Sequence, residues 1–148
     1  MMKNPETGLV KNGTHIFPVR VYFEDTDSGG IVYYATYLKY AERARTEFLR
    51  FMGYSHATMM SDYSLALVVR RCEVDYFKSA YLDDVLTVRS ANVEIKSASL
   101  LIEQTITREL DEIANILVRL VCIGETGKPM RLPNEFCDAL LPLLAFKT

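Results

Sequence analysis

The sequence has few residues of the kinds that build metal centres or disulfide frameworks. Its two histidines, His15 and His56, stand far apart, and no Cys-x-x-Cys or His-x-x-x-His spacing occurs. The three cysteines, Cys72, Cys122 and Cys137, are odd in number, widely spaced and set among hydrophobic residues. We therefore expect reduced core thiols, no metal and no cofactor, so that any chemistry must come from carboxylates, amides and hydroxyls.

Long apolar runs and an excess of one charge are also missing. No segment offers the run of about 20 apolar residues that a membrane helix requires, and residues 1–8 lack the continuous apolar stretch of a signal peptide. The net charge of -2 argues against a nucleic-acid partner. These absences predict a cytoplasmic protein without a transmembrane segment.

The chain of 148 residues is long enough for one compact domain, with 49% apolar and 24% charged residues. We expect a single domain over residues 1–148, of which 1–13 form a flexible N-terminal segment. The clearest helix signal spans residues 36–52, where Tyr37, Ala41, Ala44, Phe48 and Phe51 recur at three to four residue spacing.

The remaining pattern is mostly extended. Alternating apolar residues predict strands, the last three of which form an antiparallel meander, while a loop is expected through His56, Met59 and Met60 and a short helix at the C-terminus. This is an α+β fold, a curved antiparallel sheet of about five strands wrapped around one long central helix. The expected ranges are 14–23, 65–75, 85–95, 100–107 and 113–123 for the strands, and 133–146 for the closing helix. Because one helix cannot cover every sheet edge, we also expect at least a dimer.

The stretch from Glu24 to Tyr34 concentrates polar groups that chemistry requires more than packing does. It sets three carboxylates and the glycine pair Gly29–Gly30 between an extended segment and a helix. An acid held beside the free N–H groups of a helix start can attack a carbonyl, or activate water against it, while those donors polarise its oxygen. We place the candidate active site here. The alternative is an acidic turn that only starts a helix.

Several separate stretches resemble the hot dog fold thioesterases of the YbgC and hydroxybenzoyl-CoA thioesterase group. The resemblance covers roughly residues 15–135 and is carried by Val21–Tyr33, Tyr37–Glu47, Val68–Arg71, Tyr81–Asp84 and Gly127–Pro133. It implies a hot dog fold and hydrolysis of an acyl-CoA, or of an acyl-carrier-protein thioester, by a homodimer or a tetramer made of two dimers.

The resemblance also implies roles for individual residues. Asp27 matches the catalytic aspartate, as nucleophile or as base for water, and Gly30 with the backbone N–H near Tyr34 matches the oxyanion donors. YbgC-type members commonly carry histidine where this chain has Tyr34, whereas the hydroxybenzoyl-CoA enzymes can have tyrosine there. A phenol can donate a hydrogen bond but is a poor base at neutral pH. We expect substrate contacts from Tyr33 and, toward the CoA phosphates, from Arg70, Arg71, Lys128 and Arg131.

Two further functions remain open from the sequence. One is a dehydratase on the same fold, which would need a histidine working with a carboxylate, and the other is a non-catalytic adaptor that binds acyl-CoA or acyl-carrier protein. For Glu24 and Asp25 we weigh like-charge crowding that raises the pKa of Asp27 against a solvated turn or salt bridges with the helix arginines, and we favour the second. The sequence does not fix the acyl chain.

Overall fold

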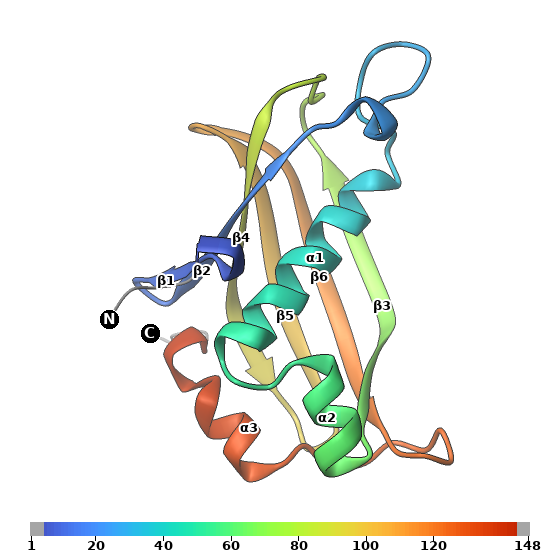
Figure 1. Ribbon diagram of the computed structural model, residues 1–148, viewed down its shortest axis with the longest axis vertical. Helices are drawn as coiled ribbons and strands as arrows, with labels where there is room; N and C mark the ends of the chain where they lie inside the picture. The colour runs from blue at the N-terminus through green and yellow to red at the C-terminus, as the bar shows by residue number, and fades with distance from the viewer. Residues whose placement is uncertain (1–4, 145–148) are drawn as a thin grey trace.

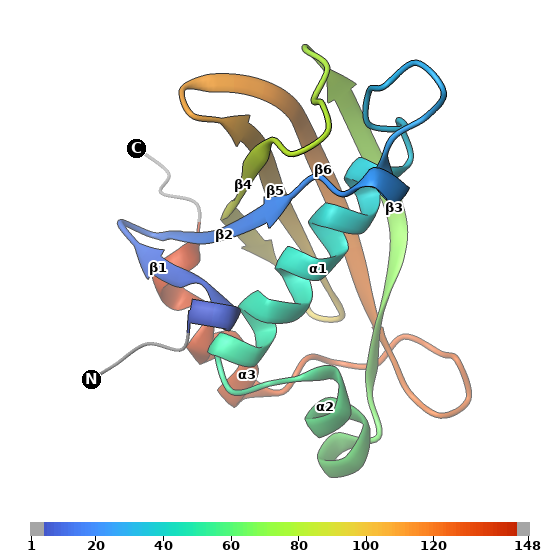
Figure 2. The same ribbon diagram turned by 45° about the horizontal axis from the view of Figure 1, so that its top comes forward.

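In the computed structural model, which describes residues 5–144, one curved antiparallel sheet wraps around a long helix (Figure 1, Figure 2). The strands are β1 (Leu9–Lys11), β2 (Thr14–Arg20), β3 (Ala66–Tyr76), β4 (Val85–Ile95), β5 (Ser99–Arg108) and β6 (Asp111–Ile123). The helices are α1 (Thr36–Phe51), α2 (His56–Tyr63) and α3 (Asn134–Ala139), with short 3-10 turns η1 (Pro5–Thr7), η2 (Phe23–Asp25) and η3 (Leu141–Leu143). Within residues 5–144, the helices are all too short or too polar to cross a membrane.

The strand order explains how the sheet is built. It runs β1-β2-β4-β5-β6-β3, so β4, β5 and β6 form the predicted meander and β3 reaches the far edge by crossing over to pair with β6. The predicted helix and the four long strands are confirmed, with boundaries that shift by at most two residues. The α+β fold with one central helix follows directly from these elements.

The middle of α1 approaches the sheet closely because its buried face carries small side chains. Ala41 and Ala44 are fully buried, and the amide of Gln104 on β5 donates to the backbone carbonyl of Ala41 at 2.9 Å. The same amide donates to Ser90 Oγ at 3.0 Å, and the buried guanidinium of Arg45 donates to Gln104 Oε1 at 2.9 Å. A larger side chain in place of either alanine would separate helix and sheet and leave these buried polar groups without partners.

The N-terminal segment departs from the prediction. Residues 1–4 lie outside the described range, but Leu9–Lys11 of the segment expected to be flexible is a sixth strand that pairs with β2. Asn12 and Gly13 both have positive φ, 52° and 73°, which is the conformation of a two-residue hairpin turn. An Asn-Gly pair is a strong hairpin signal, and it was overlooked because the strand before it has only three residues.

Three other expected elements are wrong in part. The first strand ends at Arg20 instead of Phe23, since the chain turns into η2. The expected loop through His56 is the helix α2, which Ser55 caps by accepting a hydrogen bond from the N–H of Thr58 at 3.2 Å. The closing helix is only α3 followed by η3, because Pro142 lacks the N–H that a continuing helix needs; residues 145 and 146 of that prediction lie outside the described range. Of the expected core thiols, Cys122 is buried, Cys137 is half-buried and Cys72 is exposed on β3.

His15 is a buried histidine in an aromatic surrounding. Its side chain is fully buried beside the rings of Phe17, Phe48 and Phe51, with ring centroids 6.5, 5.7 and 6.1 Å away. Nε2 lies 2.7 Å from the carbonyl oxygen of Thr7, whereas Nδ1 is buried without a partner among the described residues. Burial lowers the pKa of His15 below 6.5, its value in the unfolded chain, because the charged ring would lose its hydration.

This pKa predicts a loss of stability in mild acid. The unfolded chain takes up a proton at His15 at a higher pH than the folded chain does, so the stabilising effect is complete above pH 6.5 and is lost as the pH falls toward the lowered pKa. The free energy of unfolding should fall by up to about 1.4 kcal/mol per pH unit in that window. Urea unfolding between pH 7.5 and 5 measures it. His15→Gln should remove this part of the pH dependence, and His56→Gln, at an exposed histidine, should not.

Candidate active site

Asp27 begins a tight turn between η2 and α1. Its N–H donates to the carbonyl of Ile31 at 2.9 Å, and its carbonyl accepts from the N–H of Gly30 at 3.0 Å. Its Oδ1 accepts from the N–H of Gly29 at 2.8 Å, so the carboxylate is held in one direction. Gly30 has φ of 80°, and no heavy atom lies within 4 Å of the place where a Cβ would stand. The glycine therefore allows the turn to close, and the surface above its own Cα is open.

Asp25 fastens the start of this turn to the central helix. The side chain is only 6% exposed, and its Oδ2 accepts from Tyr40 Oη on α1 at 2.9 Å and from the N–H of Tyr22 at 2.8 Å. Its carbonyl accepts from the N–H of Tyr33 at 3.0 Å. Burial, and then the bond to Asp25, raise the pKa of Tyr40 far above its ordinary value, so this hydroxyl stays a proton donor. The expectation that Asp25 lies in a solvated turn or pairs with a helix arginine is thus wrong, whereas Glu24 is exposed.

The far end of the turn is tied to the segment before β4. The N–H of Val32 donates to the carbonyl of Ala80 at 2.9 Å, and the N–H of Ala80 donates to the hydroxyl of Tyr37 on α1 at 3.2 Å. Val32 lies in an isolated β-bridge, so α1 can begin only further along the chain. The helix begins at Thr36, after the N-cap residue Ala35, which is the start that the sequence predicts.

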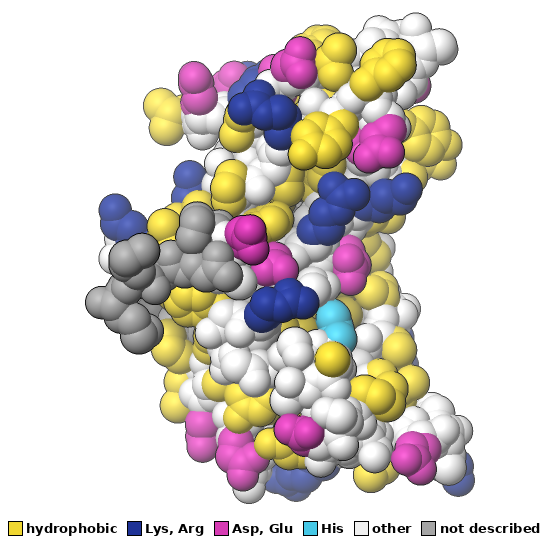
Figure 3. Space-filling view, in the orientation of Figure 1, with side chains coloured by type: hydrophobic (Ala, Val, Ile, Leu, Met, Phe, Trp, Pro, Cys, Tyr) yellow, Lys and Arg dark blue, Asp and Glu magenta, His cyan; other side chains and the backbone are white. Residues whose placement is uncertain are grey.

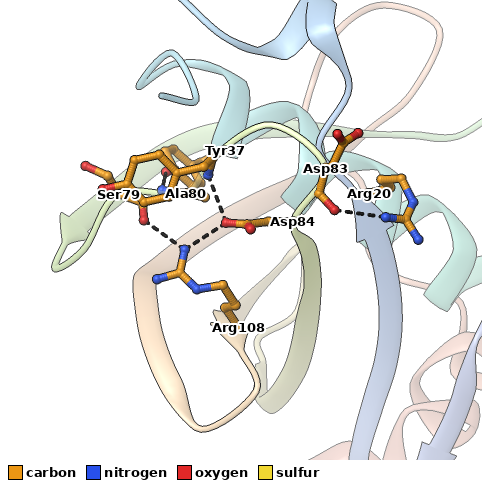
Figure 4. A network of polar contacts seen from close by, with 8 residues as sticks. Arg20, Tyr37, Ser79, Ala80, Asp83, Asp84 and Arg108 are labelled. Atoms are coloured by element: carbon orange, nitrogen blue, oxygen red, sulfur yellow. Dashed lines mark hydrogen bonds and ion pairs between the residues drawn. The ribbon is translucent and has the colours of Figure 1, made fainter. Parts of the chain in front are cut away.

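An ion pair stiffens that neighbouring segment, as Figure 4 shows. Arg108 Nη1 donates to Asp84 Oδ2 at 2.8 Å and to the carbonyl of Ser79 at 3.0 Å, and both charged side chains are about three-quarters buried. The same carboxylate oxygen accepts from the N–H of Tyr81 at 2.9 Å. The predicted turn at Tyr81–Asp84 is present, and its charges hold the backbone to which Val32 is bound.

A cleft of about 270 Å³ opens beside the turn. Tyr76 on β3 donates to the carbonyl of Tyr34 at 2.9 Å, and its ring lies 5.6 Å from that of Tyr37 and 6.4 Å from that of Tyr34, measured between centroids. Exposed apolar side chains also gather at this end of the molecule in the space-filling view (Figure 3). The lining residues are Ile31, Val32, Tyr34, Tyr37, Tyr76, Phe77, Lys78 and Ser79.

The structure brings some of the predicted catalytic groups together. Tyr34 lines the cleft, whereas Asp27 and Gly30 do not; Asp27 is exposed in the single chain, and its backbone N–H donates to the carbonyl of Ile31, which does line the cleft. Among the described residues, the backbone N–H groups of Tyr34 and Ala35 have no hydrogen-bond acceptor. These two donors precede the first turn of α1, so the arrangement can polarise a carbonyl oxygen near Tyr34.

The residues predicted to bind substrate are spread more widely. Tyr33 is exposed and its ring lies 4.8 Å from that of Tyr34. Arg70 and Arg71 line a second hollow, with Lys96, Ser99 and Arg119, away from the cleft. Lys128 and Arg131 are exposed in the loop that follows β6 and line neither of these hollows.

Sequence reasoning missed both the tyrosine that anchors the turn and the strand that walls the cleft. Tyr40 stands three residues after Tyr37 on the apolar stripe of α1, where a hydroxyl among core residues was an available signal. Tyr76 is the last residue of β3 and Phe77 follows it, and nothing in the chain's local pattern links them to residues 31–37. Within residues 5–144, no three His, Cys, Asp or Glu side chains gather closely enough to hold a metal ion.

Comparison with known proteins identifies the fold and the superfamily of this chain. The chain resembles the crystal structure of a probable thioesterase from Bartonella henselae with a TM-score of 0.78 and 36% identity, covering 81% of this chain and 99% of that one. This likeness confirms the predicted hot dog fold. A family model described as the thioesterase-like superfamily matches residues 21–140.

Relatives in sequence include YbgC proteins. The acyl-CoA thioesterase YbgC of Haemophilus influenzae is 43% identical over 121 residues, which cover 80% of this chain and 88% of that protein. The acyl-CoA thioester hydrolase YbgC of Escherichia coli O6:H1 is 40% identical over 121 residues, which cover 80% of this chain and 90% of that protein. The chain belongs to the YbgC family of the thioesterase-like superfamily. The predicted family and the predicted enzyme class, a thioester hydrolase, are confirmed.

The Asp25–Tyr40 bond should support both folding and the placement of Asp27. Tyr40→Phe keeps the buried ring but leaves Asp25 without its helix donor, so the free energy of unfolding should fall by about 1–3 kcal/mol. The value of kcat for thioester hydrolysis should fall as well, because the turn loses its fixed position. Tyr63→Phe, which removes an exposed bond to Glu135, is the matched control. Unchanged stability and kcat in Tyr40→Phe would contradict this account.

Proposed function

We propose that the protein hydrolyses the thioester of an acyl-CoA, with Asp27 as the residue that acts on the thioester carbonyl. The observation that carries the proposal is the fixed Asp27 turn next to a cleft lined by Tyr34, where the backbone N–H groups of Tyr34 and Ala35 have no acceptor among residues 5–144. The relatives named acyl-CoA thioesterases support the same substrate class.

Two routes fit the groups present. In the first, the carboxylate of Asp27 attacks the carbonyl carbon, the C–S bond breaks, the thiolate takes a proton, and water then hydrolyses the mixed anhydride to release the acid. In the second, Asp27 removes a proton from the water that attacks, and the same bond breaks. Both routes put negative charge on the carbonyl oxygen, where the N–H groups of Tyr34 and Ala35 and the adjoining helix start stabilise it. The family resemblance assigns Gly30 to this set of donors as well, but in the single chain the N–H of Gly30 already donates to the carbonyl of Asp27 at 3.0 Å.

The two histidines do not favour the dehydratase alternative. His15 is buried and lies 2.7 Å from the Thr7 carbonyl oxygen, and His56 Nε2 lies 3.2 Å from Thr46 Oγ1. Neither lines the cleft.

The adaptor alternative would require that Asp27 takes no part in any reaction. The acyl chain, a carrier-protein substrate and a cytoplasmic location stay predictions.

We propose further that the enzyme works as a homodimer, or as a pair of dimers, formed through β3. This strand ends the sheet with 11 residues, so one side of its backbone is unpaired by the strands described. Val68, Val69 and Tyr76 on it are 39%, 52% and 45% exposed. Antiparallel pairing with a second copy would satisfy that edge and cover the apolar side chains. Because Tyr76 belongs to both β3 and the cleft, a partner there would also shield the cleft and Asp27 from bulk water.

Replacement of Asp27 tests the chemistry. Asp27→Asn keeps the side-chain shape and an oxygen for the Gly29 bond but removes the charge, so kcat for acyl-CoA hydrolysis should fall at least about a hundredfold with little change in melting temperature. Thiol release over a panel of acyl-CoA substrates measures it. Glu24→Gln, at an exposed carboxylate close by in the chain, should stay within about twofold of the wild type. Near wild-type turnover by Asp27→Asn refutes the assigned role.

A charge placed on the free edge tests the dimer. Val69→Glu changes a side chain that is half exposed in the single chain, so it should alter monomer stability by no more than about 0.5 kcal/mol while shifting the mass in sedimentation toward the monomer. Val85→Glu, at a similarly exposed valine on β4, should leave the mass unchanged. A wild-type protein that sediments as a monomer at micromolar concentration would show that β3 is a free edge.

A further inference from the structure

The two backbone donors before α1 are held in place by different kinds of contact. A trans peptide points its N–H and its C=O in opposite directions, so a donor that fixes the C=O also fixes the N–H. The N–H of Tyr34 shares its peptide with the carbonyl of Tyr33, and that carbonyl accepts from the N–H of Thr36 at 2.8 Å. The chain's own backbone therefore sets the direction of the first donor.

The second donor depends on a side chain from the far edge of the sheet. The N–H of Ala35 shares its trans peptide with the carbonyl of Tyr34. In a regular helix this carbonyl would accept from the N–H of Leu38, but that N–H donates to the carbonyl of Ala35 at 3.2 Å instead. Among residues 5–144, the Tyr34 carbonyl accepts only from the hydroxyl of Tyr76 on β3, at 2.9 Å. The direction of the Ala35 N–H is therefore tied to Tyr76.

The position of Tyr76 is itself fixed. It is the last residue of β3 and lies in register with Ala114 on β6. Its ring meets those of Tyr34 and Tyr37 near their edges, at interplanar angles of 78° and 64°. Burial raises the pKa of Tyr76 above 10, its ordinary value, so the hydroxyl keeps the proton that it donates at neutral pH.

We propose that Tyr76 is a positioning residue for thioester hydrolysis, which acts through the Tyr34 carbonyl to hold the Ala35 N–H toward the thioester oxygen. The inference rests on the proposed function, in which this oxygen gains negative charge beside α1. Donors that are aimed before the reaction stabilise such charge best. A hydrogen bond to a carbonyl also polarises its peptide and makes the N–H of that peptide a stronger donor. Tyr76 thus lowers the barrier without touching the reacting atoms.

Two replacements separate this role from that of a wall of the cleft. Tyr76→Phe keeps the ring and removes only the hydroxyl, whereas Tyr76→Leu removes both. Thiol release from one acyl-CoA is measured for each variant, and melting temperatures show whether each variant folds. Tyr63→Phe is the control, because it also removes a hydroxyl bond of 2.9 Å, to Glu135, at a residue that does not line the cleft.

The positioning role predicts that kcat falls at least about tenfold in both Tyr76 variants, while KM in Tyr76→Phe stays within about twofold of the wild type. A wall of the cleft predicts instead that Tyr76→Phe behaves as the wild type and that Tyr76→Leu mainly raises KM. Tyr63→Phe should match the wild type in both constants.

The infrared spectrum of a bound thioester tests the donor without turnover. An acyl-CoA with carbon-13 in its carbonyl is bound to Asp27→Asn, in which we expect slow hydrolysis, with and without Tyr76→Phe. A stronger hydrogen bond lowers the stretching frequency of a carbonyl, so the frequency should rise when Tyr76→Phe is added and should not change when Tyr63→Phe is added.

A smaller loss of kcat in Tyr76→Phe, or a carbonyl frequency that does not respond to the loss of the hydroxyl, overturns the proposal. A wild type that binds the labelled thioester but releases no thiol contradicts the proposed function instead. The infrared comparison, made in that case on the wild type and Tyr76→Phe, still decides whether Tyr76 directs the Ala35 N–H.

Discussion

The hydrogen bond between Asp25 and Tyr40 is the contact on which the candidate site depends most. It joins a buried carboxylate of the turn to a hydroxyl of the central helix, and the helix is itself fixed to the sheet by Gln104 and Arg45. Two residues after Asp25 comes Asp27, which the proposed mechanism requires to meet a substrate from a loop that has no regular structure. A loop holds a catalytic group in place only if a rigid element supports it, and here α1 supplies that element.

The need to anchor this loop explains why its two aspartates differ in burial and in hydrogen bonding. Asp25 is buried and accepts three hydrogen bonds through its side chain and carbonyl, whereas Asp27 is exposed and its side chain accepts one from Gly29. One carboxylate therefore maintains structure, and the other is free to meet a ligand. The cleft beside them is bounded by β3, the strand left at the edge of the sheet, so the proposed dimer would place the site next to a second copy of the chain.

Much of this fold could be predicted because its long elements carry strong periodic signals. The apolar stripe on α1 and the alternation in β4, β5 and β6 each extend over ten or more residues, so local errors average out. The predictions of short elements failed because these elements carry too few residues for a periodic signal. β1 has three residues, and the start of α2 is marked by a single capping serine.

The site was predictable only in part. The motif located Asp27, Gly30 and Tyr34, since glycines and acids in one loop are visible in sequence. The partners that hold or surround them, Tyr40, Ala80 and Tyr76, come from segments 15 to 50 residues away and meet the turn only through the fold.

The central claim is that Asp27 acts directly on a thioester carbonyl beside the start of α1. A crystal structure of the Asp27→Asn protein with an uncleaved acyl-CoA tests it most directly. The account predicts that the carbonyl carbon lies about 3–3.5 Å from the side chain of residue 27, with the carbonyl oxygen directed at the N–H groups of Tyr34 and Ala35. A thioester bound in another hollow, or turned away from residue 27 with water activated by a different side chain, would contradict it.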